Sequence, residues 1–553
     1  MRAVVFAGVA LLAVSCGGTL PDDFSTADPS CTVDRPPAAP VVVTPFAGAS
    51  DLLSDEIAIS ASQFSDPDGD AMGGAEVELW AVSPLGVETS RIWSAQMSSM
   101  PAVVKISDGV FDFGLEDVQE DTDYAVRVRY RDARPPVGDH DCSTWSDWSA
   151  WRTFHTDDGS RALFDDTKIQ DIYLEIPQDS WDAINAEARP PGCVPFERTY
   201  HKGAITIGGQ RFDDVGIHAK GGCGSARNLS GKGEFKINLE WDDPDVPGCP
   251  EHRRYAGQRT ITLNNGVQDQ TAGHERVAYE FFHAMGVGSA RIATVRVNVN
   301  GAYWGVYQLV ESVERPMLKR WYKSNAGMLY EGTYWCDVAS QNLPVGDVDN
   351  KCLTREFHPS ECDAPDDVGS DPQTYDPVRD FVAKLDAIPA GQFLPAARQF
   401  LDLDEFLSDW AAASVLGHWD SYELNIVNNY RIYHDPSTGL WHFLPSGLDQ
   451  TMGSDVNPFG PNGRVAQLCL QNTECKALFA ARLREAAATF ESLDLVRRAQ
   501  QIHDQIMADV QADPRKEYSM ATWESANANW RAWIAARPAQ IRQKLAQAGF
   551  PGP

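Results

Sequence analysis

The sequence predicts an all-β sandwich over residues 36–157, followed by a two-lobed α+β domain over residues 160–553. Over the first range, short runs of alternating apolar and polar residues are separated by turns, which is typical of a β-sandwich. In the second range, strand-like runs come first and helical spacing dominates after Cys475, an order typical of an α+β domain. A chain of 553 residues is also too long for one hydrophobic core.

The first 35 residues have the pattern of an export signal and a tether. Arg2 precedes an apolar run, Val4 to Val14, that is too short to cross a bilayer as a helix. The run ends in Leu-Ala-Val-Ser-Cys, which resembles the bacterial lipobox, whose cysteine is lipidated and becomes the mature N-terminus. We therefore expect a signal peptide over residues 1–16, lipidation of Cys16 and a tether over residues 17–35. A plain secretory signal cut nearby is the alternative.

This leader predicts an exported protein, held in the bacterial cell envelope, at a membrane or the cell surface, by its lipid anchor alone. The cysteines fit such an oxidising location, because assigning Cys16 to lipid leaves ten of the eleven, an even number suited to disulfides. Cys469 and Cys475 can bridge locally, and Cys31 and Cys142 would bracket the sandwich. Six further cysteines allow 15 connectivities: Cys193, Cys223, Cys249, Cys336, Cys352 and Cys362.

The formal net charge of −31 limits the partners of the protein. Nucleic acid is not expected as a partner, because its phosphates would be repelled. An acidic surface of a secreted protein accounts for the charge without a specific ligand. Residues 66–70, Asp-Pro-Asp-Gly-Asp, place carboxylates at alternate positions, and we interpret them as a turn in preference to a calcium site.

The last part of the sandwich has an aromatic signature. A strand-like run over residues 122–130 contains Arg127 and Arg129, and Trp-Ser-Asp-Trp-Ser-Ala-Trp follows at residues 145–151. In domains with a Trp-Ser-x-Trp-Ser element, tryptophan rings interleave with arginine side chains, so a cation–π ladder is expected. On these residues the segment resembles a fibronectin type III module.

The pattern with the clearest chemical implication lies in residues 418–425. Asp420 and Asn425 are five residues apart, and Asp449 follows in Gly447-Leu448-Asp449-Gln450. A carboxylate can accept a hydroxyl proton, and hard oxygen ligands hold the divalent cations on a triphosphate. Protein kinases have an Asp, an Asn and a second Asp in this order, so the pattern predicts a phosphotransfer site.

A glycine-rich segment lies upstream in the same domain. Residues 215–225 contain four glycines beside an expected strand, and glycine lets backbone N–H groups approach phosphate oxygens. The run from Lys232 to Leu239 predicts the next strand, where a kinase carries its phosphate-binding lysine. A tight turn pinned by a disulfide through Cys223 is the other interpretation of the glycines.

Five ordered segments complete the comparison with known families: Val215 to Gly221, Lys232 to Ile237, Asn300 to Glu311, Asn429 to Tyr433 and Leu448 to Gly453. The most specific is Asn-Gly-Ala-Tyr-Trp-Gly-Val-Tyr-Gln-Leu-Val-Glu at residues 300–311. On these motifs the stretch from Leu163 to about Thr489 resembles the CotH kinase family. The resemblance implies an atypical two-lobed protein-kinase-like fold that uses ATP and Mg²⁺.

The resemblance also implies residue roles. Asp420 would be the catalytic base, and Asp449 would coordinate magnesium. Asn425 fits the kinase metal-ligand spacing and Asn429 fits the family motif, so both are candidates, with Asn425 preferred. The candidates for nucleotide binding are Lys220, Gly221, Lys232, Lys236 and Glu311.

Within that set, Lys236 is the preferred phosphate ligand because it lies deeper in an apolar strand than Lys232. Glu275 or Glu280, on an expected helix over residues 271–285, would pair with it. Glu311 would meet adenine through its backbone. Two departures from the family stand out: Gly447 occupies a position where many members have a second metal carboxylate, and His218 replaces an arginine of the glycine loop.

These expectations lead to two hypotheses of function. The first is an extracytoplasmic kinase that transfers the ATP γ-phosphate to Ser or Thr of a surface or secreted protein. The second is a non-catalytic surface scaffold or binding protein, a pseudokinase, which Gly447 and the scarcity of ATP outside the cytoplasm favour. Asp420, Asn425 and Asp449 in order favour the first. A serine hydrolase is not expected, because the sequence has no Gly-x-Ser-x-Gly.

Overall fold

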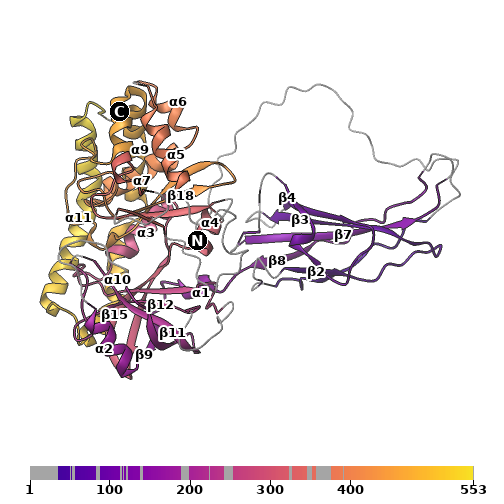
Figure 1. Ribbon diagram of the computed structural model, residues 1–553, viewed down its shortest axis with the longest axis horizontal. Coiled ribbons are helices and arrows are strands. Elements are labelled where there is room, and N and C mark those ends of the chain that lie inside the picture. The colour runs from indigo at the N-terminus through magenta and orange to yellow at the C-terminus, as the bar shows by residue number, and fades with distance from the viewer. Residues whose placement is uncertain are drawn as a thin grey trace. The chain divides into compact units, whose positions relative to one another are not determined.

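The computed structural model describes residues 35–551 with several gaps, at residues 50–51, 53–56, 83–87, 113–114, 116–117, 120–121, 137–140, 188–197, 223, 242–252, 323–324, 326, 346–351, 356–374 and 390. The predicted signal peptide, the lipidation of Cys16 and all but the last residue of the tether lie outside the described residues. The chain divides into two compact units, Met1–Asp158 and Gly159–Pro553 (Figure 1).

The first unit consists of two β-sheets. Its elements are β1 (Val42–Thr44), β2 (Ala58–Ala61), β3 (Ala71–Val82), β4 (Glu88–Met97), β5 (Val104–Lys105), η1 (Ile106–Asp108), β6 (Val110–Phe111), β7 (Thr122–Ala133) and β8 (Arg152–Thr156). One sheet has the order β1-β2-β5 and the other the order β6-β4-β3-β7-β8. Ile59, Val77 and Val128, from both sheets, are fully buried in one core, as expected for alternating strands.

The expected cation–π ladder is present in this unit. Arg127 lies 4.2 Å from the Trp148 ring and 4.5 Å from the Trp151 ring, and Arg129 lies 4.6 Å from the Trp145 ring. The guanidinium groups also pair with Glu78 and Glu76 on β3. Residues 66–70 form a turn, in which Asp66 Oδ1 accepts the backbone N–H groups of residues 68 and 70.

The second unit begins with a closed barrel of strands. Its elements are α1 (Ser160–Leu163), β9 (Gln170–Glu175), α2 (Gln178–Ala186), β10 (His201–Ile207), β11 (Gln210–Lys220), β12 (Glu234–Asn238), β13 (Thr260–Asn264), α3 (His274–Ala284), β14 (Ile292–Val299) and β15 (Ala302–Glu311). The strand order around the barrel is β10-β11-β12-β13-β15-β14-β9. Phe235, Ile237 and Leu263 point into a core of buried apolar side chains, so the next residues along these strands face outward.

Strands β14 and β15 form an antiparallel hairpin that turns at Asn300-Gly301. Asn300 and Gly301 both have positive φ, +50° and +79°, as a two-residue hairpin loop requires. The side-chain amide of Asn300 also bonds the backbone N–H and C=O of Ile176, at 2.7 and 2.9 Å. The turn is therefore fastened to the end of β9.

The rest of the unit is mainly helical. It contains α4 (Arg315–Trp321), β16 (Met328–Gly332), η2 (Ser340–Asn342), β17 (Leu353–Arg355), α5 (Asp376–Asp386), α6 (Phe393–Ala397), α7 (Leu403–Leu416), β18 (Tyr430–Asp435), β19 (Leu440–Pro445), η3 (Leu448–Gln450), α8 (Arg464–Gln471), α9 (Thr473–Ser492), α10 (Leu495–Ala512) and α11 (Met520–Gln547). A four-stranded sheet has the order β17-β16-β18-β19. The mixed α+β composition of the second unit agrees with the prediction. We refer to the barrel with α3 as the small lobe and to the part after β15 as the helical lobe.

Among its described residues, the helical lobe has two disulfides. Cys469 bonds Cys475, as predicted, and Cys336 bonds Cys352. Cys142 of the first unit is disulfide-bonded, while Cys31 lies outside the described residues. The remaining cysteines of the predicted set also lie outside the described residues: Cys193, Cys223, Cys249 and Cys362.

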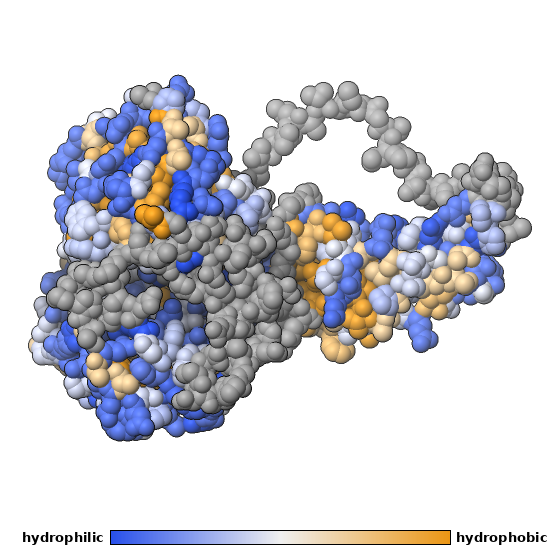
Figure 2. Space-filling model, viewed as in Figure 1, coloured by the Kyte–Doolittle hydropathy of each residue, from blue (hydrophilic) through white to orange (hydrophobic). Residues whose placement is uncertain are grey.

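Among the coloured residues of the second unit in Figure 2, hydrophilic residues predominate, with apolar patches between them. This agrees with the acidic composition. None of the helices in the described part of the chain combines the length and the apolar character that crossing a bilayer requires.

The C-terminal helices return to the small lobe. Figure 1 shows α10 and α11 along one side of the unit, from the helical lobe to the barrel. Asp513, directly after α10, accepts a hydrogen bond from Lys232 Nζ at 2.7 Å and from the backbone N–H of Val306 at 3.1 Å. Both side chains of the Lys232–Asp513 ion pair are almost fully buried. The carboxylate occupies the space beside Gly305, where a Cβ atom would lie 2.2 Å from Asp513 Oδ2.

We predict that Gly305→Ala destabilises the protein by about 3 kcal/mol, because the new Cβ displaces the Asp513 carboxylate and φ is +132°. Gly453→Ala is the matched control, since this exposed glycine has its nearest neighbouring atom at 4.0 Å, and its effect should stay within about 0.5 kcal/mol. Denaturant unfolding followed by tryptophan fluorescence measures both. Equal effects of the two substitutions would contradict the tight fit at Gly305.

Candidate active site

Asp420 lies just beyond a helix whose ends are well defined. The side chain of Asp402 caps the start of α7 by accepting the backbone N–H of Glu405 at 3.0 Å. Gly417, with φ +65°, ends the helix in the left-handed conformation typical of helix C-termini. The chain then passes through His418 to Asp420, which is 4% exposed. Helix α7 therefore leads directly into the segment that carries Asp420.

The Asp420 carboxylate is held on one side only. Its Oδ2 accepts a hydrogen bond from Asn429 Nδ2 at 2.7 Å. Its Oδ1 lies 3.4 Å from His418 Nε2 and accepts no hydrogen bond from any residue in the described part of the chain. A buried carboxylate oxygen without a donor can accept a proton from an incoming hydroxyl group.

The structure brings Asn429, and not Asn425, to Asp420. The Asn425 side chain is exposed, and its backbone is held by Trp419 and by Asn462, whose Nδ2 donates to the Asn425 carbonyl at 2.6 Å. The preference for Asn425 therefore needs correction. Spacing in the sequence does not show that Asn429 adopts the left-handed backbone (φ +47°) that turns its amide toward Asp420.

Gly447 packs directly against Asn429. A Cβ atom at residue 447 would lie 2.6 Å from Asn429 Cγ, and φ of Gly447 is +63°. A larger side chain at this position would therefore displace the amide that holds Asp420. Asn429 can therefore occupy its position only because residue 447 has no side chain, and hence no second carboxylate.

Asp449 lies in η3, beside the start of α3 from the small lobe. Its backbone carbonyl faces the ring of His274, with Nδ1 at 3.1 Å. Burial raises the pKa of the Asp449 carboxyl to about 7, helped by the nearby carboxylates of Glu234, Asp269 and Asp420 and opposed by Lys220. The two lobes thus place like charges close together at this point.

Lys220 is the lysine that reaches this group of carboxylates. It ends β11 opposite Glu234 on β12, and its Nζ lies 3.8 Å from Glu234 Oε2. Lys220 Nζ also donates to Asn264 Oδ1, and Asn264 Nδ2 donates to the two carboxylate oxygens of Glu275 at 3.1 and 3.3 Å. Lys220 is therefore linked to Glu275 on α3 through one asparagine.

Glu275 is the helix glutamate of the site. Burial raises the pKa of its carboxyl to about 8, and the charge of Asp449 adds to this increase, whereas Asn264 and Lys220 oppose it. Glu280, the other candidate, instead pairs with Arg498 at 2.8 Å on another side of α3. We refer to Lys220, Glu234, Glu275 and Asp449 as the carboxylate cluster.

The other two candidate lysines lie elsewhere. Lys232, expected on a strand, precedes β12 and is held in the buried ion pair with Asp513, where it cannot contact phosphate. Lys236 lies on the outer face of β12, with His218 and Thr262 as its neighbours on the adjoining strands. Lys220 is therefore the candidate lysine that contacts the cluster, through Glu234 and Asn264.

Glu311 and Gly221 have structural contacts of their own. Burial opposes ionisation of Glu311, but Arg320 and Arg291 outweigh it and lower the pKa of its carboxyl to about 2. The backbone N–H of Glu311 donates to the carbonyl of Arg291 at 2.9 Å, so this N–H is not available to adenine. The carbonyl of Gly221 accepts from Arg198 at 2.6 Å, directly after Lys220. His218 bonds the carbonyl of Ala219, which is a structural role.

Glu234 and Asn264 were not predicted from the sequence. Both are polar residues at strand ends, next to the core residues Phe235 and Leu263, and alternation places them on the outer face of the barrel. This alternation was the one signal in the sequence that could have identified them as outward-facing residues. Only the pairing of β11 with β12 and of β12 with β13 shows that both residues lie beside Lys220.

The donor atoms of the site fit Mg²⁺ bound together with a nucleotide. Magnesium is usually held by one or two carboxylates plus substrate phosphates, so a compact protein cage is not required. Within the described part of the chain no donor reaches the buried Asp420 Oδ1, and burial, together with the neighbouring carboxylates, raises the pKa of Asp449. Within the described residues, Asp402, Glu405 and His442 form a tighter group, but His442 Nδ1 and Glu405 Oε2 already bond each other at 2.5 Å.

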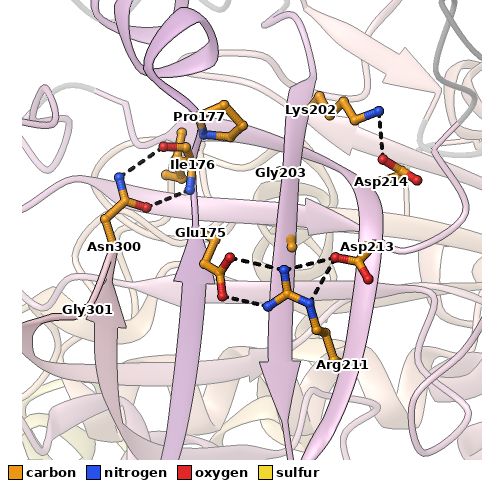
Figure 3. Close-up of a pocket in the computed structure, with 11 residues that line it drawn as sticks. Glu175, Ile176, Pro177, Lys202, Gly203, Arg211, Asp213, Asp214, Asn300 and Gly301 are labelled. Atoms are coloured by element: carbon orange, nitrogen blue, oxygen red, sulfur yellow. Dashed lines mark hydrogen bonds and ion pairs between the residues drawn. The ribbon is translucent and has the colours of Figure 1, made fainter.

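A pocket on the outside of the barrel is a weaker candidate. Figure 3 shows that the charged residues around it face one another. Arg211 bonds Glu175 at 2.5 Å and Asp213 at 2.9 Å, and Lys202 pairs with Asp214 at 2.6 Å. Three carboxylates thus face two cations that already pair with them, and exposed ion pairs of this kind contribute little, so the pocket offers a ligand only one excess negative charge.

Taken together, a strand lysine, a helix glutamate, a buried aspartate beyond a long helix and a second aspartate after a hairpin define a kinase-like protein. The chain belongs to the CotH kinase protein family, whose profile matches residues 217–541, more than half of its length.

Three curated relatives match with low identity. Inner spore coat protein H of Bacillus subtilis (strain 168) is 24% identical over 205 residues, which are 37% of this chain and 53% of the relative. Invasin CotH2 of Rhizopus delemar is 23% identical over 373 residues, 63% of this chain and 56% of the relative. Invasin CotH3 of the same organism is 22% identical and covers 65% of this chain and 59% of that protein. The chain thus spans only between about half and three fifths of these relatives.

Two solved kinase structures were also found. The Helicobacter pylori proinflammatory kinase CtkA matches 60% of this chain and 97% of its own, with 9% identity and a TM-score of 0.26. Titin kinase with its flanking domains matches 51% and 38%, with 11% identity and a TM-score of 0.15. At such scores the assignment depends on the family match.

The raised pKa values of Glu275 and Asp449 predict that the protein without nucleotide or divalent cation loses stability as the pH rises. The unfolded carboxyls titrate near pH 4, whereas the folded values are about 8 and about 7. Between these limits the folded chain retains protons that the unfolded chain has released, so the free energy of unfolding falls with pH.

Glu275→Gln needs no proton and should reduce the drop in melting temperature between pH 5.5 and pH 8. Glu280→Gln is the control, because Glu280 pairs with Arg498 and its carboxyl is part-exposed. Melting curves at both pH values measure the effect. The same drop in Glu275→Gln and wild type would show that Glu275 is already ionised.

Proposed function

We propose that the protein is an exported kinase that transfers the γ-phosphate of ATP to a Ser or Thr hydroxyl of a surface or secreted protein. The observation that carries this proposal is Asp420, a buried carboxylate that Asn429 holds and whose own Oδ1 accepts no hydrogen bond from the residues that the structure describes. Asp449 and Lys220, from the two lobes, lie close enough to influence each other's charge. A base, a cation and a metal-binding carboxylate are the groups that phosphoryl transfer requires.

Each residue then has a defined task. Asp420 Oδ1 accepts the proton of the attacking Ser or Thr hydroxyl. The hydroxyl oxygen then bonds the γ-phosphorus, while the bond from the γ-phosphorus to the bridging oxygen breaks and ADP leaves. Lys220 places positive charge beside the phosphates, and Glu275 orients it through Asn264. Asp449 would hold Mg²⁺, with Asn429 as the nearest amide to Asp420, and the ion would supply charge neutralisation on the phosphates.

The proposed location outside the cytoplasm has three supports. The first 16 residues have the composition of a lipoprotein signal ending at Cys16. Two disulfides lie in the described part of the second unit, and such bonds persist in oxidising compartments. Relatives of the family are named as a spore coat protein and as invasins. The two-sheet first unit with its tryptophan–arginine ladder supports a fibronectin type III-like module, which would contact partners.

A nucleotide-binding scaffold without turnover is the second candidate function. The observation in its favour is Gly447, which leaves Asp449 as the only carboxylate of the segment from Ser446 to Gln450. In that case the cluster would still bind a nucleotide with its divalent cation, and the acceptor hydroxyl would have no role. Transfer of label distinguishes the two functions.

We predict that the full-length protein labels itself or an added acceptor with radioactive ATP and Mg²⁺, and that Asp420→Ala and Asp449→Ala each lower the rate at least about 100-fold. Asp376→Ala is the control, since this side chain is 80% exposed. If the wild type binds ATP in a thermal-shift assay but transfers no label, the protein is the scaffold. If the wild type shows no label transfer and no thermal shift, both candidate functions are contradicted.

A second pair of variants tests which asparagine acts with Asp420. Asn429→Gly removes the amide while suiting the left-handed backbone, so kcat should fall about 10- to 100-fold through misorientation of the base. Asn425→Gly, at an exposed side chain, should leave kcat within about twofold. Steady-state kinetics of label transfer compares them. A larger loss for Asn425→Gly would restore the assignment made from spacing.

A further inference from the structure

The segment from Gly224 to Lys232 connects the strand that carries Lys220 with the strand that carries Glu234, and C-terminal residues hold it. We propose that the turn between α10 and α11, residues 513–519, positions this segment for the phosphates of the nucleotide. The proposal rests on the proposed kinase function and adds positioning residues to it. These residues lie almost 300 positions later in the chain than the segment that they hold.

The first contact is a two-pronged ion pair. Arg227 Nε and Nη2 donate to the two carboxylate oxygens of Glu517, at 2.6 and 2.7 Å. The remaining nitrogen of the same guanidinium donates to the carbonyl of Gly224 at 2.7 Å. Glu517 thus fixes an arginine that in turn fixes the backbone of the glycine-rich segment.

A second contact holds the other end of the segment. Arg515 donates to the carbonyls of Ser230 and Gly231, at 2.9 and 2.5 Å, and its guanidinium lies 3.9 Å from the centre of the Trp304 ring. The pairing with Trp304 on β15 prevents the arginine from following a moving loop. Both ends of the segment are therefore tied to the same turn.

The turn itself is anchored to the small lobe by a buried ion pair. Asp513 bonds Lys232 and the backbone N–H of Val306, and its Oδ1 accepts the N–H of Arg515 at 2.8 Å. Both partners of the Lys232 ion pair are nearly fully buried, at 5% and 2% side-chain exposure. An anchor of this kind keeps Arg515 and Glu517 in place, so the loop does not have to be ordered when the ligand binds.

This arrangement has a consequence for nucleotide affinity. Lys220 is separated from Gly224 by only three residues, and Glu234 follows Lys232 after one residue. Motion of the segment would therefore displace Lys220 and Glu234, the two members of the cluster that flank it. Loss of the C-terminal contacts should weaken ATP binding and leave the chemistry at Asp420 unchanged, because Asp420 lies in the helical lobe.

Glu517→Arg tests the proposal in the full-length protein, because the side chain is 40% exposed and is not itself a partner in the buried Lys232–Asp513 ion pair. The KM for ATP should rise about threefold to tenfold with kcat within about twofold. Hydrogen exchange of residues 224–232 without nucleotide should accelerate. The double variant Arg227→Glu/Glu517→Arg should regain part of both losses. Glu491→Arg, which breaks the exposed pair with Arg542 on other helices, is the matched control and should change neither quantity.

Two results would overturn the role of the turn. One is an unchanged KM in Glu517→Arg, whether or not exchange accelerates. The other is an exchange rate of residues 224–232 equal to that of the wild type. A wild-type chain that binds no ATP would instead remove the kinase function and the nucleotide role together, so the two failures are distinguishable.

Discussion

Three carboxylates and one lysine meet where the small lobe faces the helical lobe. Lys220 lies 3.8 Å from Glu234 and is linked through Asn264 to Glu275, while Asp449 approaches from the helical lobe. One positive charge cannot balance three negative charges in a buried place, and the carboxyls of Glu275 and Asp449 therefore keep protons up to pH values near neutrality. Such a group lowers the stability of the empty protein, which is typical of sites that receive a cation.

The rest of the second unit holds this group together. The barrel supplies Lys220 and Glu234 from neighbouring strands, because alternation directs them outward while Phe235 fills the core. Helix α3 supplies Glu275, and its first turn contacts the carbonyl of Asp449 through His274. Since like charges repel, the two lobes need other contacts to stay in register. The buried ion pair between Lys232 and Asp513 is one of them.

Local structure was predictable from the sequence wherever near neighbours determine it. The hairpin at Asn300-Gly301 depends on two residues with positive φ, and helix α7 depends on its cap at Asp402 and its end at Gly417. The disulfide between Cys469 and Cys475 is equally local. Each of these features is set within about a dozen residues.

Features that depend on distant residues were not predictable. Closure of the barrel needs β9 to pair with β14 in parallel, more than a hundred residues later, and no pattern in either strand specifies the partner. Lys232 fits a phosphate-binding lysine until Asp513, 281 residues away, is seen to neutralise it. Asn425 fits the kinase spacing, but the backbone of Asn429 decides which amide turns toward Asp420. Spacing describes order along the chain and leaves side-chain direction open.

Gly447 acquires a different meaning from the packing around it. In the sequence it is a missing carboxylate, which favours a protein without turnover. In the structure, the space that a side chain at residue 447 would need is filled by the amide of Asn429, and that amide holds Asp420 at 2.7 Å. A carboxylate at residue 447 and this orientation of Asp420 therefore exclude each other. Asp449 is the only carboxylate of residues 446–450, and Asn429 orients the Asp420 carboxylate, so the glycine is compatible with either candidate function.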